Sequence, residues 1–163
     1  MNRYPTEAAR RTRLMKVRWP HGPTCAKCSG GDATFLKSRS IYQCRKCRNQ
    51  FSATTGTIMH RSRLDLGIWF RATELLIKEG YNSYYSYADD FRMTSKELAA
   101  RLGIQYVAAH RLRNTILADI GIGGKGFLLD IIGLQPIEAP REITPNTLAH
   151  FSWVFEKANG WRF

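Results

Sequence analysis

The sequence lacks any long run of apolar residues and has very few acidic residues in its first part. No apolar stretch approaches the roughly 20 residues that a membrane-spanning helix needs, so we do not expect the chain to be an integral membrane protein. No apolar segment follows the basic N-terminus, so we expect no secretory signal either. Hydrophobic residues make up 44% and aromatic residues 12% of the 163 residues, which is typical of a packed globular protein.

The excess of positive charge lies entirely in residues 1–63. These contain 14 Lys and Arg and only two acids, whereas residues 64–163 contain 11 bases and 11 acids, so the net charge of +12 belongs to the first segment. This pattern favours a nucleic-acid binder, because phosphates neutralised by basic side chains release condensed counterions. One alternative is a merely basic soluble protein. A membrane surface is disfavoured, because no stretch pairs Lys and Arg with a long apolar face.

All four cysteines lie within 23 residues, as two C-x-x-C pairs separated by fifteen residues: Cys25, Cys28, Cys44 and Cys47. Two such pairs at this separation predict a zinc site, since each tight turn directs two thiolates at one point. Four cysteines leave no open coordination position, so we expect one structural Zn²⁺. The alternative is a pair of disulfides, which a reducing cytoplasm disfavours.

The segment between the cysteine pairs predicts a zinc ribbon. Residues 33–43 place strand-forming residues on either side of a basic turn, and Phe51 and Ser52 continue an extended run after the second pair. About 30 residues cannot bury enough surface to fold unaided. Zinc binding, worth roughly 10–16 kcal/mol in small metal-dependent modules, would supply the missing stability.

Downstream the apolar residues recur at helical spacing, which predicts a helix over residues 65–78. A tyrosine-rich connection, Gly80–Tyr87, follows. Residues 94–97 (Thr-Ser-Lys-Glu) have the form of a capping box and start a second helix, which Gly103 ends. A third helix opens near Gln105. Two helices joined by a glycine turn indicate a DNA-binding helix-turn-helix, although two packed helices of an unrelated bundle have a similar pattern.

The candidate DNA contacts fall into two groups. The first lies near the start of the third helix, where exposed side chains would reach base edges or phosphates: Gln105, Tyr106, Val107, His110, Arg111 and Arg113. The second contacts phosphates from the ribbon and the N-terminal helix: Arg10, Arg11, Arg13, Lys16, Arg39, Arg45, Lys46, Arg48, Arg61 and Arg63. His110 is read equally well as an ordinary surface histidine. His21, His60 and His150 have no ligand spacing, so we expect surface or structural roles for them.

The last segment begins with a glycine-rich link over residues 121–126. The apolar run Phe127–Leu134 is either a strand or a helix, and a further helix is expected from Thr144 and Pro145. This part ends with many large apolar groups, among them Trp153, Phe155, Trp161 and Phe163. They pack on the chain's own helices, or form a homodimer or a contact with a partner such as RNA polymerase.

Three motifs together resemble the amino-terminal part of bacterial insertion-sequence transposases of the fifteen-ninety-five family, relatives of the ISXO type. They lie at residues 18–28 (Arg-Trp-Pro-His-Gly-Pro-Thr-Cys-Ala-Lys-Cys), at 42–57 around the second cysteine pair, and at 60–70. The resemblance covers residues 10–117. It implies a zinc ribbon and a helix-turn-helix, which in that family precede an RNase H-like catalytic domain with metal-binding acids.

Two departures from the family limit this resemblance. The tyrosine-rich stretch 81–92 looks like an insertion, and the family's first acid motif is missing after the third helix. Asp130, Glu138 and Glu142 are better read as solvated or capping carboxylates than as a catalytic triad, because 46 residues after Leu117 are too few for that domain. We therefore expect no enzymatic activity.

Together these features predict an α+β chain: a basic helix at 1–19, a four-cysteine ribbon of antiparallel strands at 20–60, a mainly helical helix-turn-helix domain at 61–120, and a linker with a helical extension at 121–163. The expected function is zinc-dependent, sequence-specific binding of double-stranded DNA by a non-catalytic transcription regulator in the cytoplasm, at the nucleoid. The alternatives are an interaction module that contacts the transcription machinery, or a remnant or split transposase subunit.

Overall fold

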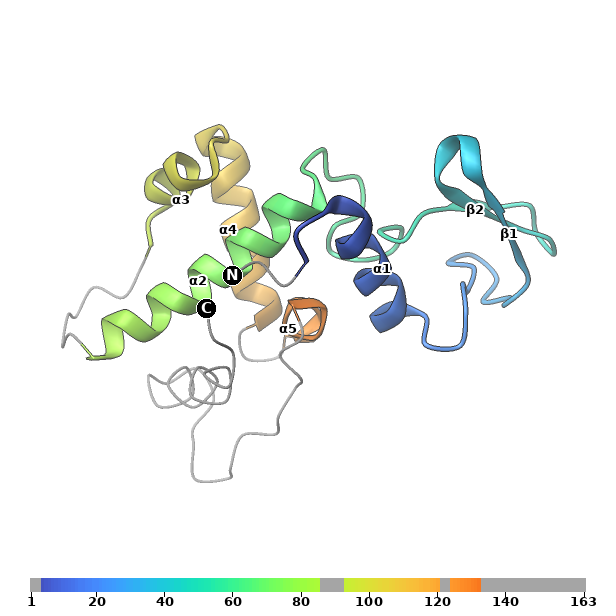
Figure 1. Cartoon of the computed structure of the whole chain (residues 1–163), viewed down its shortest axis with the longest axis horizontal. Helices are drawn as coiled ribbons and strands as arrows, with labels where there is room; N and C mark the ends of the chain where they lie inside the picture. Colours follow the sequence, from blue (N-terminus) through green and yellow to red (C-terminus); the bar gives the residue numbers. More distant parts are fainter. Residues whose placement is uncertain (1–3, 86–92, 121–123, 133–163) are drawn as a thin grey trace, which may run out of the picture. The chain divides into compact units, whose positions relative to one another are not determined.

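A computed structural model of the chain describes residues 4–85, 93–120 and 124–132 (Figure 1). The chain divides into two compact units, Tyr4–Leu66 and the part that begins at Gly67, which are described separately. The first contains α1 (Glu7–Arg18), β1 (Ala33–Leu36), a 3-10 turn (Lys37–Arg39), β2 (Ile41–Cys44) and β3 (Gln50–Phe51). The second consists of α2 (Leu66–Tyr85), α3 (Ser95–Leu102), α4 (Tyr106–Ile120) and α5 (Phe127–Ile132). A small antiparallel sheet followed by helices confirms the predicted α+β class. The four-part division of the chain stays a prediction.

Helix α1 begins at a capped end and packs within the first unit. The Thr6 side chain accepts a hydrogen bond from the Ala9 N–H at 3.1 Å, which satisfies a donor in the first helical turn. Leu14 is fully buried, and Trp19, directly after the helix, is 8% exposed. This helix lies within the segment 1–19 for which a basic helix is predicted.

The sheet has the strand order β1-β2-β3, and both pairs are antiparallel. Leu36 pairs with Ile41 across the 3-10 turn, so the basic turn between two strands is as predicted. Phe35 pairs with Tyr42, which in turn pairs with Phe51. Because directly paired residues share a face of a sheet, these three rings form one row on one side of it.

Helix α2 buries the apolar residues whose helical spacing predicted it, but it ends later than predicted. Trp69, Phe70, Thr73, Leu76 and Ile77 are all buried, as the helical spacing indicates. The predicted end at residue 78 is wrong, since the helix continues to Tyr85 and takes in the first part of the tyrosine-rich connection. A glycine inside a helix costs only about 1 kcal/mol, which a helix already held by buried residues tolerates. Residues 86–92 lie outside the described part.

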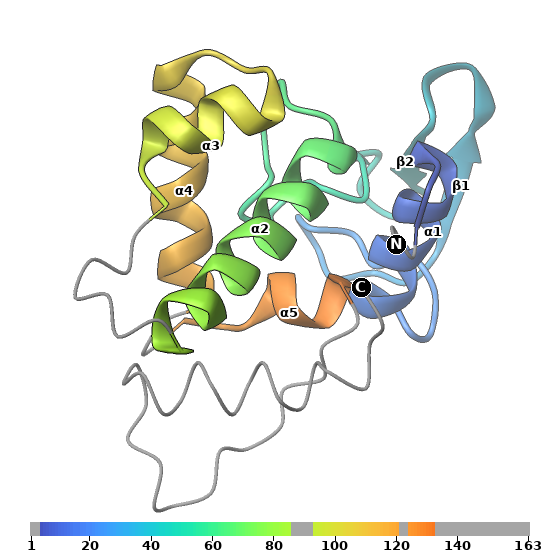
Figure 2. The same ribbon diagram turned by 60° about the vertical axis from the view of Figure 1, so that its left-hand side comes forward.

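Helices α3 and α4 lie against each other in both views of the second unit (Figure 2). Gly103 ends α3 with φ of +65°, a left-handed conformation that glycine adopts without strain. Helix α4 then begins, and the Gln105 carbonyl accepts from the Ala109 N–H at 3.0 Å. The side chains buried in these two helices include Leu98, Leu102, Ala109, Leu112 and Ile116.

The apolar run that begins at Phe127 was expected to form either a strand or a helix. It forms a helix, α5, which spans Phe127–Ile132. The Asp119 carboxylate of α4 accepts from the Leu128 N–H at 2.8 Å and so caps this short helix. No helix within the described residues combines the length and the apolar character needed to cross a bilayer. The helix expected from Thr144 and the four aromatic residues after it lie outside the described part.

Replacing Thr94 by Ala tests the cap that begins α3. The Thr94 hydroxyl accepts from the Glu97 N–H at 3.2 Å, and the Glu97 carboxylate accepts from the Thr94 N–H at 2.8 Å. We expect Thr94→Ala to lower the free energy of unfolding of the helical unit by about 1 kcal/mol, measured by urea denaturation followed by circular dichroism. An unchanged transition at pH 7 would contradict this role.

The same cap makes a pH-dependent contribution through Glu97. The N–H and hydroxyl of Thr94 lower the pKa of Glu97 below its ordinary value. Its contribution is therefore complete above the unfolded pKa of about 4.3 and is lost as the pH falls through the lower folded value. The penalty of Glu97→Gln should accordingly fade in acid.

Candidate metal centre and nucleic-acid interface

The first cysteine pair lies on a tight turn closed by backbone hydrogen bonds. The Ser29 N–H donates to the Cys25 carbonyl, and the Cys25 N–H donates to the Gly30 carbonyl, both at 2.9 Å. Ser29 has φ of +56°, a left-handed conformation that turns the chain back after Cys28. Both thiols of this pair therefore point to the same side of the turn.

The second pair repeats this geometry, with Arg48 and Asn49 in the places of Ser29 and Gly30. The Arg48 N–H donates to the Cys44 carbonyl, and the Cys44 N–H donates to the Asn49 carbonyl, again at 2.9 Å. Arg48 has φ of +57°, as Ser29 does in the first turn. Cys44 is the last residue of β2, so the sheet itself fixes where this turn lies.

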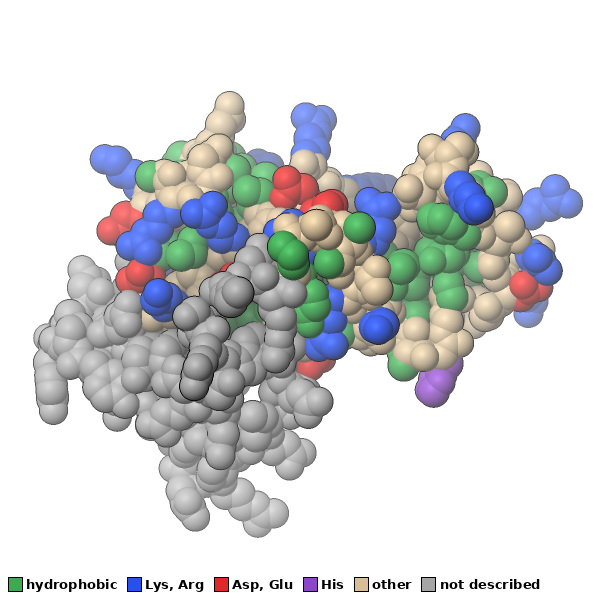
Figure 3. Space-filling view, viewed as in Figure 1, with side chains coloured by type: hydrophobic (Ala, Val, Ile, Leu, Met, Phe, Trp, Pro, Cys, Tyr) green, Lys and Arg blue, Asp and Glu red, His purple; other side chains and the backbone are tan. Residues whose placement is uncertain are grey.

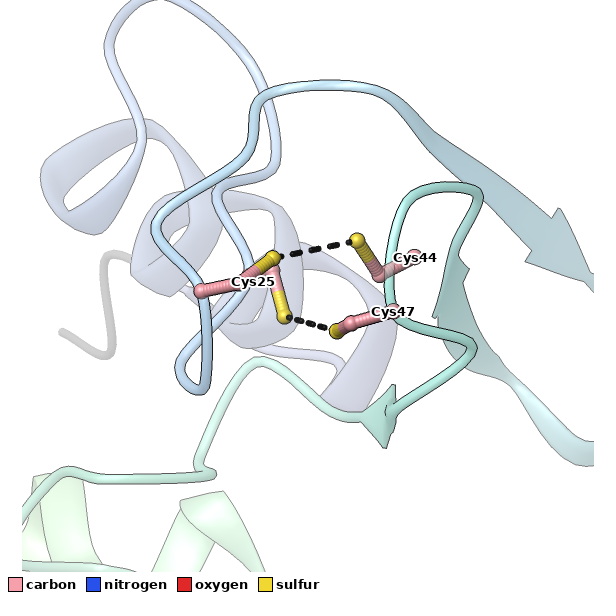
Figure 4. A group of neighbouring side chains, drawn as sticks. Cys25, Cys44 and Cys47 are labelled. Atoms are coloured by element: carbon pink, nitrogen blue, oxygen red, sulfur yellow. Dashed lines mark hydrogen bonds between the residues drawn. The ribbon is translucent and has the colours of Figure 1, made fainter.

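The two turns bring the four sulfur atoms together (Figure 4). The Sγ atoms of Cys25 and Cys47 are 3.6 Å apart, as are those of Cys28 and Cys44, and all four lie within 4.8 Å of one another. These separations exclude disulfide bonds, which need about 2.05 Å. Four sulfurs at 2.3 Å from a tetrahedral zinc ion are about 3.8 Å apart, so the thiols fit such an ion.

Sulfur atoms packed this closely cannot all become thiolates without a cation. Burial raises the pKa of Cys25, but the N–H groups of Cys28 and Lys27 outweigh it, and the pKa falls to about 6. The Asn49 N–H acts to lower the pKa of Cys47, but burial and the neighbouring sulfurs raise it to about 12. A divalent cation removes this conflict, since it neutralises the charge that the four thiolates accumulate.

The rings of Trp19, Tyr42 and Phe51 pack against one another in the first unit and form an aromatic wall. The Trp19 ring meets Tyr42 and Phe51 edge to face, with centroids 5.5 Å and 5.7 Å away. The Tyr42 hydroxyl donates to the Met15 sulfur at 3.4 Å, which joins the sheet to α1. These contacts give the small sheet the apolar support that its own strands are too short to provide.

Sequence reasoning missed Arg18, which ties the end of α1 to the segment after the sheet. Its guanidinium donates to the carbonyls of Ser52 at 3.2 Å and Ala53 at 2.7 Å, and also to that of Thr55. It also lies over the Trp19 ring, 4.7 Å from the centroid. Burial lowers the pKa of Arg18 from its ordinary value. A sequence signal would be hard to find, because all three acceptors are main-chain atoms.

The basic residues predicted to contact phosphates differ in how accessible they are. Those of the ribbon and the following segment are exposed: Arg39, Arg45, Lys46, Arg48, Arg61 and Arg63. On α1, Lys16 is exposed and Arg11 and Arg13 are half-buried. Arg45 also pairs with Asp32 at 3.5 Å and donates to the Thr34 hydroxyl at 3.0 Å.

Arg10 is placed differently from the prediction that it grips phosphates. Its side chain is only 13% exposed, pairs with Glu7 at 3.6 Å and donates to the Pro5 carbonyl at 3.1 Å. These contacts fix the start of α1. In this structure the Arg10 side chain therefore stabilises the start of α1, and little of it is accessible to a phosphate.

The predicted contacts near the start of α4 are mostly exposed. Tyr106 and Val107 are 57% and 58% exposed, and Gln105 and Arg111 are exposed as well. Arg113 differs from them, because it is half-buried and its Nε donates to the Met93 carbonyl at 2.8 Å.

His110 is held by neighbours on both sides of its ring. Its Nδ1 lies 3.1 Å from the Ser95 hydroxyl of α3, and its Nε2 lies 3.2 Å from the side-chain nitrogen of Asn114. The Tyr106 ring stacks on it with centroids 5.9 Å apart. His110 therefore links α3 to α4 and supports Tyr106.

Comparison with known families identifies the first part of the chain. Residues 5–50 match the family described as "Transposase zinc-ribbon domain", of the fifteen-ninety-five insertion-sequence group. The match includes α1 and all four cysteines, so these cysteines form the structural zinc site of a transposase zinc ribbon. It identifies no catalytic domain. No curated protein and no solved structure matches the chain.

Removal of the metal tests the role of the cysteines. We expect one zinc ion per chain, and we expect its affinity to fall as the pH falls, because protons compete for the thiolates. Chelation should abolish the near-ultraviolet dichroism of the packed aromatic wall, whereas the helices of the second unit should retain most of the far-ultraviolet signal. An unaltered aromatic signal in zinc-free protein would show that the metal is dispensable.

Arg48→Gly tests the strained second turn. Relief of the left-handed strain at a residue with a Cβ, about 1–2 kcal/mol, should offset the added backbone entropy of glycine, at most about 1 kcal/mol. Denaturation of the zinc-loaded variant should therefore show a first unit at least as stable as that of the native chain. Ser29→Gly, at the matching position of the first turn, should behave the same way. A loss above 1 kcal/mol at Arg48 alone would assign its side chain a structural role.

Proposed function

We propose that the chain is a sequence-specific, double-stranded DNA-binding protein derived from the DNA-binding part of a transposase, and that it acts as a non-catalytic transcription regulator. The observation that carries this proposal is the exposed start of α4, which follows the turn at Gly103. The ribbon holds the basic surface that accompanies it. A protein with this function acts at the nucleoid, in the cytoplasm.

The arrangement of α3 and α4 supports a helix-turn-helix. The first helix has 8 residues, the second has 15, and the three-residue connection between them contains Gly103. A helix of 15 residues is about 22 Å long and fits the major groove of B-DNA, which is about 12 Å wide. The motif reads bases through the N-terminal part of its second helix, which here is the exposed end of α4.

Three side chains at this end suit contacts with base edges. Gln105 can form two hydrogen bonds with adenine, and Val107 can contact a thymine methyl group. Tyr106 can do the same, and its ring is held in place by His110. Arg111 is exposed on the same helix and suits a phosphate, which would fix the register of the helix in the groove.

The zinc ribbon and the segment after it supply the sequence-independent part of the affinity. Their exposed arginines and lysines lie within residues 1–63, the segment that carries the entire net charge of +12. Figure 3 shows Lys and Arg side chains around the part of the described surface that carries the sheet, with few acidic groups beside them. Such a surface binds phosphates of any sequence and brings α4 to the duplex.

The proposal that the chain is not an enzyme concerns the three acids considered above as a catalytic triad. Asp130 lies in α5, and Glu138 and Glu142 lie outside the described residues. Within the described ranges, the cysteine cluster is the one group of side chains spaced to hold a metal. The alternative functions, a contact with RNA polymerase and a C-terminal homodimer, involve aromatic residues beyond 132 and stay predictions, as does a split or remnant transposase subunit.

Selection of bound duplexes from a random pool, followed by salt titration, tests the proposal. We expect a preferred sequence, and we expect its affinity to fall steeply with salt. Gln105→Ala should reduce discrimination against a wrong base by about 1–3 kcal/mol while leaving non-specific binding unchanged. Arg48→Gly, which we expect to keep the fold, should weaken all duplexes alike. It should also reduce the slope of log affinity against log salt concentration by about 0.9. A native chain that enriches no sequence would refute the sequence-specific function.

A further inference from the structure

The aromatic row across the sheet ends in a ring that the first unit leaves exposed. Phe51 is 2% exposed, Tyr42 is half-buried, and Phe35 on the outer strand β1 is 45% exposed. Trp19 covers Phe51 and Tyr42 edge to face. The Phe35 ring lies 5.0 Å from Tyr42, tilted by 47°, so a neighbouring ring supports one side of it.

Phe35 is held in one place by the fold. It pairs directly with Tyr42 in the register of β1 and β2, and Tyr42 is itself fixed by its contacts with Met15 and Trp19. An exposed ring on a rigid strand loses little conformational freedom when another flat group stacks on it. A hydrophobic side chain on a loose loop would lose more conformational freedom on binding.

Two basic residues follow this ring closely in the chain. Lys37 and Arg39 follow it in the exposed turn between β1 and β2. The acid nearest in sequence, Asp32, pairs with Arg45. On the unit that carries the sheet, hydrophobic side chains gather on one face with Lys and Arg at its edges (Figure 3). A second copy of this basic unit would meet repulsion at such a surface, whereas a polyanion is attracted.

We propose that Phe35, with Lys37 and Arg39, forms a binding site for unpaired bases of single-stranded DNA. Single-strand binders combine an exposed aromatic ring, on which a base stacks, with nearby cations that contact the backbone. A duplex is a poorer occupant, because its bases are already stacked on one another. This site lies in a different unit from α4 and takes a different form of DNA. It shares only Arg39 with the basic surface proposed to bind duplex phosphates, so the two proposals can fail separately.

Binding of the zinc-loaded full chain to a labelled oligothymidine of about 12 nucleotides, measured by fluorescence anisotropy, tests this site. We expect Phe35→Ala to weaken binding roughly 5- to 150-fold, the range seen when one stacking residue is removed. Phe35→Tyr, which keeps a ring, should bind like the native chain. Gln50→Ala, on β3 and on the opposite face of the same sheet, is the control and should also bind normally. Zinc content and near-ultraviolet dichroism verify that each variant is folded.

An abasic strand of equal length separates stacking from charge. It keeps the phosphates and lacks the bases, so Phe35→Ala and the native chain should bind it equally. Lys37→Gln and Arg39→Gln should each reduce the salt slope for oligothymidine by about 0.7. Variants of α4 should alter duplex preference only, so failure of one proposal leaves the other testable.

Three results would overturn the single-strand site. The first is equal oligothymidine affinity for Phe35→Ala and the native chain. The second is an equal loss for oligothymidine, the abasic strand and a duplex, which would make Phe35 a general contact. The third is a dimer in analytical ultracentrifugation that Phe35→Ala abolishes, which would make a second copy the occupant.

Discussion

The first unit depends on the convergence of four sulfur atoms on one point. Its strands have four, four and two residues, so the sheet buries little surface of its own. The two cysteine turns lie at one end of this sheet and bring together four thiols, which cannot ionise together without a cation. The metal therefore completes a fold that the apolar contacts of α1 and the aromatic rings support from the side.

This constraint explains how one short segment can present two different surfaces. The cysteine turns and the basic turn between β1 and β2 hold Arg39, Arg45 and Arg48 outward. The same sheet fixes a row of rings whose last member, Phe35, remains accessible. Rigid display of charge and of a flat apolar group from one scaffold is a common requirement of nucleic-acid binding.

Much of this could be predicted from the sequence where the pattern is local. Cysteine spacing indicated the metal site, the Thr94–Glu97 motif indicated the start of α3, and Gly103 indicated its end. Long-range partners could not be predicted. Arg18 bonds to carbonyls more than thirty residues away, and His110 is engaged by Ser95 of another helix. The extension of α2 to Tyr85 was missed because propensity is a weak guide beside tertiary packing.

X-ray absorption at the zinc edge of the purified chain tests the central claim most directly. We predict a first shell of four sulfur atoms at about 2.3 Å and no lighter ligand. A shell that contains nitrogen or oxygen would mean that the four cysteines do not close around one ion. In that case the geometry on which the basic surface and the aromatic row depend would be wrong.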